Sequence, residues 1–261
     1  MTRTIAAFAL VVLAGCAGAP RAPDAAARAE LAPTGKLRAG MNTGNTLFTQ
    51  RDPATGELRG VSVDLMRELA SRLGVPLELV IHATPGQVAD DAQKNTWDVT
   101  ILAIEPARAK TIAFSPAITE IDATYMVRRD SPLRAVEQVD APGVRIAAAA
   151  KAGYELYLTR TLKSATLVRT QGLQASLDAL GRREADAVAA LKPNLLTALP
   201  KLQDARLLDG RFMAVNHGLG TPAGKRAAAA YVKAFVEDLN ASGFVARSIE
   251  RHRVQGLSAV R

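Results

Sequence analysis

The 261-residue chain contains one cysteine, one tryptophan and three histidines, and aromatic residues make up 4% of it. A single cysteine excludes an internal disulfide, so the fold depends on packing and polar contacts. His82, His217 and His252 share no metal-ligand spacing, so we expect neither a metal site nor a cofactor. The formal net charge is +8, but the basic residues are dispersed and few aromatics accompany them, which argues against a nucleic-acid partner.

Long apolar runs are also missing, because no later segment approaches the roughly 18 uninterrupted apolar residues of a membrane span. Near the start, residues 5–13 form a short apolar run behind Arg3, and Leu13-Ala14-Gly15-Cys16 follows it. This order is typical of a bacterial lipoprotein signal, in which residues 1–15 are removed and Cys16 is lipidated. An ordinary signal peptide with an incidental cysteine is the alternative. We therefore expect a periplasmic lipoprotein that touches the membrane through its anchor alone.

Residues 16–33 are rich in alanine and proline and lack an amphipathic period, which predicts a flexible tether. The remaining chain is long for one compact core and suits two lobes of ordinary domain size.

Two series of alternating strands and helices follow the tether, which predicts an α/β fold with parallel strands. The first has strands at residues 36–41, 77–81 and 99–104, with helices at 62–73 and from Thr84-Pro85 onward. The second has strands at residues 144–149, 166–170 and 187–190, with helices at 154–163 and 173–182. A strand at 212–219 and a helix from Thr221-Pro222 to residue 242 end the pattern.

Residues 97–116, WDVTILAIEPARAKTIAFSP, are the most informative stretch. Asp98 precedes a buried strand, and Pro106 opens a helical turn at a position that tolerates its missing N–H. Arg108 therefore lies just past the carboxyl end of a strand, where open α/β sheets place ligand-contacting groups.

This stretch resembles the signature of bacterial extracellular solute-binding proteins of the polar amino-acid type, DV-x5-T-P-E-R-A-K-x3-F-S. KLRAGM, GVSVDLMRELASRLGV and GRREADAVAA occur in the family's order around it. The resemblance implies a type II periplasmic-binding-protein fold, a two-lobed flytrap with a hinge. Lobe 1 would comprise residues 34–125 and 214–261, the inserted lobe 2 residues 126–213, and the hinge residues 125–129 and 213–218. It further implies a monomeric, non-enzymatic protein that captures a small-molecule solute and delivers it to the permease of an ATP-binding-cassette importer.

In the family, the arginine matched by Arg108 grips the ligand's carboxylate, whereas several partners of the ligand's ammonium are replaced here. The family's two acidic positions fall on Asn42 and Leu191, a stacking aromatic falls on Asn45, and Phe48 keeps the later aromatic position. A hydroxyl position falls on Ala103, and the glycine-threonine pair of lobe 2 falls near Lys151 and Ala152, with Lys192 following Leu191. The resemblance thus implies an anion grip without an ammonium grip, and a small anionic ligand, carboxylate or amino-acid-like.

Simpler interpretations and other functions accompany this hypothesis. Arg108 could pair with Glu105 on a helical turn, and Lys151 and Lys192 could be solvated loop lysines. The family's fold also hosts periplasmic dehydratases of the prephenate or arogenate type, for which Glu155 is the candidate acid or base. A sensory protein that presents its solute to a membrane receptor is the third possibility.

Overall fold

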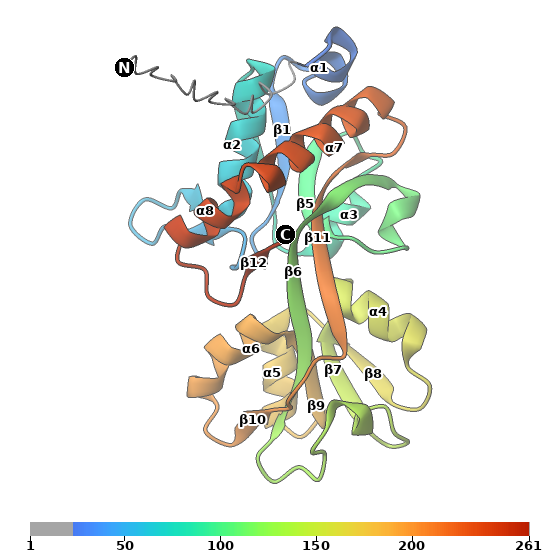
Figure 1. Ribbon diagram of the computed structural model, residues 1–261. Helices are drawn as coiled ribbons and strands as arrows, with labels where there is room; N and C mark the ends of the chain where they lie inside the picture. Colours follow the sequence, from blue (N-terminus) through green and yellow to red (C-terminus); the bar gives the residue numbers. More distant parts are fainter. Residues whose placement is uncertain (1–22, 261) are drawn as a thin grey trace, which may run out of the picture.

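The computed structural model describes residues 23–260, in which two lobes are joined by two long crossing strands (Figure 1). The upper lobe in Figure 1 holds α1 (Ala25–Leu31), β1 (Leu37–Asn42), β2 (Gln50–Arg51), β3 (Leu58–Arg59), α2 (Val61–Leu73), β4 (Leu77–His82), α3 (Pro85–Asp90), β5 (Val99–Ala103) and the 3-10 turn η1 (Arg108–Lys110). The strands that cross between the lobes are β6 (Ile112–Arg128) and β11 (Met213–Pro222). After β11, the chain completes the upper lobe with α7 (Arg226–Ala241), α8 (Phe244–Arg251) and β12 (Ser258–Ala259).

The lower lobe is inserted between the crossing strands. It consists of η2 (Val136–Gln138), β7 (Arg145–Ala149), α4 (Gly153–Thr161), β8 (Thr166–Thr170), α5 (Leu173–Gly181), β9 (Ala187–Leu191), α6 (Lys192–Ala198), η3 (Leu199–Lys201) and β10 (Ala205–Leu207). The predicted two-lobed α/β fold is therefore confirmed. No helix within residues 23–260 combines the length and the apolar character that crossing a membrane requires.

One sheet runs through both lobes in the order β4-β1-β5-β11-β6-β9-β7-β8. β1 is parallel to β4 and β5, β7 is parallel to β8 and β9, and β11 is antiparallel to β5 and β6. In each lobe the parallel strands direct their carboxyl ends toward the other lobe, so the loops that follow them meet in between.

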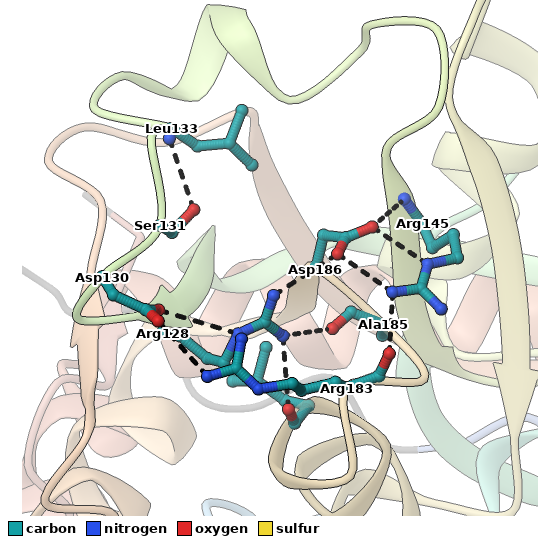
Figure 2. A network of polar contacts seen from close by, with 9 residues as sticks. Arg128, Asp130, Ser131, Leu133, Arg145, Arg183, Ala185 and Asp186 are labelled. Carbon is teal, nitrogen blue, oxygen red and sulfur yellow. Dashed lines mark hydrogen bonds and ion pairs between the residues drawn. The ribbon is translucent and has the colours of Figure 1, made fainter.

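In each lobe, an arginine-aspartate clamp joins the first and third strands of the parallel series. These strands are β1 and β5 in the upper lobe and β7 and β9 in the lower lobe. In the lower lobe the backbone N–H and Nε of Arg145 donate to Oδ2 of Asp186, both at 3.0 Å, and Nη2 donates to the Arg183 carbonyl (Figure 2). In the upper lobe the backbone N–H and Nε of Arg38 donate to Oδ2 of Asp98 at 3.1 and 2.9 Å. Asp98 directly precedes β5, and Asp186 directly precedes β9, so both aspartates are structural residues.

The sequence interpretation was wrong about residues 25–31, which form α1 instead of a flexible tether. Asp24 caps the helix by accepting the N–H of Ala27 at 2.7 Å, and Ala27 and Leu31 are buried where α1 packs against α7. Cys16 and the predicted signal peptide lie outside the described residues.

Two further boundaries differ from the prediction. β11 continues through Pro222 because its residues still pair with Ala113 and Ile112 of β6, so α7 begins only at Arg226. Residues 123–127 of β6 pair with β9 of the lower lobe, so β6 enters that lobe before the predicted hinge at residues 125–129. The part of β6 that spans the lobes precedes Ala123, opposite residues 213–216 of β11.

Candidate functional site

A cleft between the lobes gathers most of the residues that the sequence singled out. Its walls include eight of those residues: Asn42, Asn45, Phe48, Ala103, Arg108, Lys151, Ala152 and Leu191. The cavity encloses about 310 Å³, which is at the small end of the range for small-molecule sites. Lys192 is the exception, because it begins α6 and lines a separate surface hollow with Glu120 and Asp122.

Arg108 is 4% exposed and lies at the start of η1, directly after the loop that follows β5. Its Nη1 donates to the carbonyl of Ala103 at 2.9 Å, and its Nη2 donates across the cleft to the carbonyl of Lys151 at 2.8 Å. Nε has no hydrogen-bond partner among residues 23–260. Burial lowers the pKa of Arg108 to about 10, so the guanidinium stays charged at neutral pH with donors to spare. The simpler interpretation, a surface pair with Glu105, does not apply because that carboxylate binds Arg160 instead.

Lys151 contacts the opposite wall of the cleft through both its side chain and its backbone. Its Nζ lies 2.6 Å from Oδ2 of Asp90, and both side chains are more than half exposed. Lys151 has a φ of +58°, a left-handed conformation that is uncommon for a side-chain-bearing residue. Asp90 supplies the cleft lining's one carboxylate within residues 23–260, so Arg108, Lys151 and Asp90 leave the cleft with an excess of one positive charge.

His217 lies on β11 and faces the cleft beside Phe48, with ring centroids 4.7 Å apart. It is paired with Ala103 across the sheet, so it lies next to the carbonyl that Arg108 binds. Burial, assisted by the charge of Arg108, lowers the pKa of His217 to about 3 against an opposing effect of the Val215 carbonyl. The ring is therefore neutral, and its Nδ1 has no hydrogen-bond partner in the described part of the chain.

Sequence reasoning missed several cleft residues with polar side chains. These are Gln87, Asp90, Tyr154, Thr170, Gln171, Asn194 and His217. Most of them come from the ends of strands and the starts of helices that were predicted correctly. Their position at the carboxyl end of a predicted parallel strand was the available signal, and it would have pointed to Thr170, the last residue of β8, and to Gln171 after it.

Glu155, the candidate acid or base of a dehydratase, is buried in α4 and is not among the residues that line the cleft. Its carboxylate accepts the backbone N–H of Lys151 at 2.9 Å, Nε of Arg169 at 2.8 Å and the hydroxyl of Thr159 at 2.7 Å. These contacts make it a structural group that fixes the Lys151 loop.

Trp97 and Asp64 have structural roles as well. The single tryptophan, Trp97, is fully buried and donates its Nε1 to the Val88 carbonyl at 3.0 Å. Asp64 accepts from Ser248, Arg251 and His252 in the upper lobe. Within residues 23–260, no group of three or more His, Cys, Asp or Glu side chains is arranged to hold a metal ion.

Comparison with known proteins places this geometry in context. The family described as bacterial extracellular solute-binding proteins, family 3, matches residues 37–254. A search of the curated proteins found no significant match.

Solved structures share the fold at low identity. A variant of ArgBP from T. maritima has a TM-score of 0.72 and 23% identity, covering 86% of this chain and 98% of that one. The ancestral amino acid-binding protein AncCDT-1, a precursor of cyclohexadienyl dehydratase, has a TM-score of 0.71 and 22% identity over 86% and 98% of the two chains. AbpA from Streptococcus pneumoniae, bound to L-arginine, has a TM-score of 0.72 and 19% identity over 85% and 95%.

Proposed function

The chain belongs to family 3 of the bacterial extracellular solute-binding proteins, and on that premise we propose that it captures a small carboxylate between its lobes and delivers it to an ATP-binding-cassette importer. The observation that carries the ligand class is Arg108, a buried charged guanidinium in a small cleft, whose Nε has no acceptor among residues 23–260. A planar guanidinium can meet a carboxylate with two parallel hydrogen bonds, which a lysine cannot reproduce.

The remaining walls of the cleft favour an anionic ligand over a zwitterionic one. Leu191 presents a buried aliphatic side chain where an ammonium partner would be needed, and Asn42 carries no charge. Asp90 is the carboxylate that could attract an ammonium, but Lys151 already neutralises it at 2.6 Å. An ammonium in this cleft would therefore lack a free charged partner, each such hydrogen bond contributing roughly 1.5–3 kcal/mol.

Calorimetric titration of matched pairs tests this ligand class, each pair being an amino acid and its deaminated analogue, such as L-glutamate and 2-oxoglutarate. In a pair that binds, the deaminated acid is expected to bind more tightly than the amino acid. Arg108→Ala should weaken the binding of that acid by several kcal/mol. Tighter binding of the amino acid would overturn the anion-only proposal. Unchanged affinity in Arg108→Ala would remove that residue from the site.

Binding is proposed to shift the population toward the closed arrangement of the lobes, with bending in β6 before Ala123 and in residues 213–216 of β11. The interrupted order of the chain supports this, since two strands join the lobes. Solution scattering should give a radius of gyration with saturating ligand that is no larger than that of the ligand-free protein. Expansion on binding would contradict closure.

A binding role is favoured over a dehydratase because Glu155 is fully engaged and lies away from the cleft lining. Delivery to an importer is favoured by family membership alone, and a sensory role would use the same cleft. Neighbouring genes for permease and ATPase subunits are the expected finding, whereas a neighbouring membrane receptor gene would favour the sensory role.

We also propose that Cys16 is lipidated and tethers the protein, as a monomer, to the periplasmic side of a membrane. The sequence Leu13-Ala14-Gly15-Cys16 behind a short apolar run supports this. Cys16→Ser should release the protein or leave its precursor uncleaved. Fractionation of that variant with membranes at the normal mature mass would refute the anchor.

A further inference from the structure

A buried carboxylate of one lobe is neutralised by an arginine of the other lobe. Glu105 lies between β5 and η1 in the upper lobe and is 1% exposed. Arg160 of α4 in the lower lobe donates from Nη1 to Oε2 and from Nη2 to Oε1, the latter at 3.3 Å. No other side chain of residues 23–260 donates to this carboxylate, although the charge of Arg108 also acts on it.

Among the ion pairs between the lobes within residues 23–260, that of Glu105 and Arg160 is the one with an almost fully buried member. The pair of Lys151 and Asp90 is 59% and 52% exposed, and ion pairs at such exposure contribute little. Separating the lobes would instead remove Arg160 from the almost fully buried carboxylate of Glu105. The loss of this paired cation costs free energy until water solvates the carboxylate.

Two glycines show that the lobes are already in close contact. A Cβ added to Gly153 at the start of α4 would lie 2.6 Å from Cβ of Ala103 in the upper lobe. A Cβ added to Gly86 would lie 2.8 Å from Cβ of Lys151 in the lower lobe. The pair of Glu105 and Arg160 therefore belongs to a closed arrangement that any larger side chain at these glycines would prevent.

We propose that Glu105 and Arg160 form a latch that holds the lobes closed before a ligand arrives. Neither residue is among those that line the cleft, so both act as positioning residues that set the closed population. Because only the closed form completes the site, the apparent affinity for every ligand scales with this population. The inference goes beyond the proposed ligand class and does not depend on it.

Solution scattering of the ligand-free protein tests the latch. Glu105→Gln and Arg160→Gln should each lower the closed-to-open ratio roughly tenfold, equivalent to the loss of one charge-assisted contact. The radius of gyration should rise toward that of Gly153→Ala, whose added methyl group serves as the open reference. The double variant should expand no further than the larger single change, because the two residues act as one pair.

Arg145→Gln is the matched control, since Arg145 is 41% exposed against 40% for Arg160 and pairs with Asp186 inside one lobe. Its radius of gyration should equal that of the wild type. The latch is overturned if both single variants scatter like the wild type, or if the wild type already scatters like Gly153→Ala. It is equally overturned if Arg145→Gln expands as much as Arg160→Gln, or if the double variant shows the sum of the two single effects.

Discussion

Arg108 and His217 are neighbours in the cleft, and burial has different consequences for them. Arg108 starts from such a high pKa that a decrease to about 10 leaves it charged. His217 starts at 6.5, so burial and the charge of Arg108 keep it neutral at physiological pH. The cleft therefore offers an anion one fixed positive charge and one uncharged imidazole.

The neutral imidazole of His217 makes the fold sensitive to acid. Its pKa falls from 6.5 to about 3 on folding, so the unfolded chain binds the extra proton and stability declines as the pH drops below 6.5. At pH 5 this cost should be about 2 kcal/mol. Urea unfolding of the wild type and of His217→Gln at pH 7 and pH 5 measures it. The variant should lose less stability between the two pH values, and parallel losses would show that His217 does not titrate as described.

Eight of the nine residues that the sequence predicted to bind the ligand line the cleft, because the motif around Arg108 and the ends of strands mark those positions. Lys192 lines a different hollow because it begins α6 directly after Leu191, and neighbours in sequence project in different directions. His217 and Asp90 were missed because their place in the cleft depends on pairing between β11 and β5 and on the approach of the lobes. Such contacts between distant segments leave no local pattern.

At the scale of elements, the two lobes repeat one device, the clamp between the first and third parallel strands. Asp98 is fully buried and binds both Arg38 and Lys225, whose Nζ lies 3.0 Å from Oδ1. Asp186 is 25% exposed, and its hydrogen bond with Arg145 is the main cause of its lowered pKa.

The difference in burial predicts different costs for the two clamps. Asp98→Asn should destabilise the protein by about 3 kcal/mol, because it leaves two cations without their buried partner. Asp186→Asn should cost about 1 kcal/mol. Because the pKa of Asp186 is lowered on folding, its contribution is present above 3.8 and is lost as the pH falls through the folded value. Denaturant titrations at pH 7 and at pH 3 check both statements, and a larger cost for Asp186→Asn would contradict them.

α1 shows where composition misleads. Residues 23–33 contain many alanines and a proline at each end, which favours a linker on composition, yet Ala27 and Leu31 are spaced to bury one helical face against α7. A helix this short is not stable by itself, so its formation depends on tertiary packing that local sequence does not reveal.

Leu31 is the residue that tests this packing. It is completely buried, so Leu31→Ala should cost 2–4 kcal/mol, roughly the loss seen for buried leucines. Glu30→Ala is the control. Glu30 is more exposed than Leu31, and its carboxylate accepts the N–H of Ala228. Thermal unfolding compares the two variants, and a negligible loss in Leu31→Ala would mean that α1 is not docked.

For the whole molecule, the order of strands and helices predicted two α/β series, and the family resemblance implied that they form two lobes joined by crossing strands. The parallel series in each lobe have local signals, namely the apolar runs and the proline and glycine residues at helix ends. The sequence does not show where β6 passes between the lobes, because the strand continues without interruption and only its change of partner from β11 to β9 marks the passage. Pairing partners are a property of the assembled sheet.

A thermal-shift comparison of the wild type and Arg108→Ala against carboxylates, amino acids and amines tests whether Arg108 captures an anionic ligand. A bound ligand stabilises the folded protein by about 2.7 kcal/mol at a hundredfold excess over Kd, and the cavity of the variant keeps its other walls. We predict that at least one carboxylate raises the melting temperature of the wild type and that the same compound leaves Arg108→Ala unchanged. Equal shifts in both proteins, or shifts caused by amines alone, would contradict capture of an anion by Arg108.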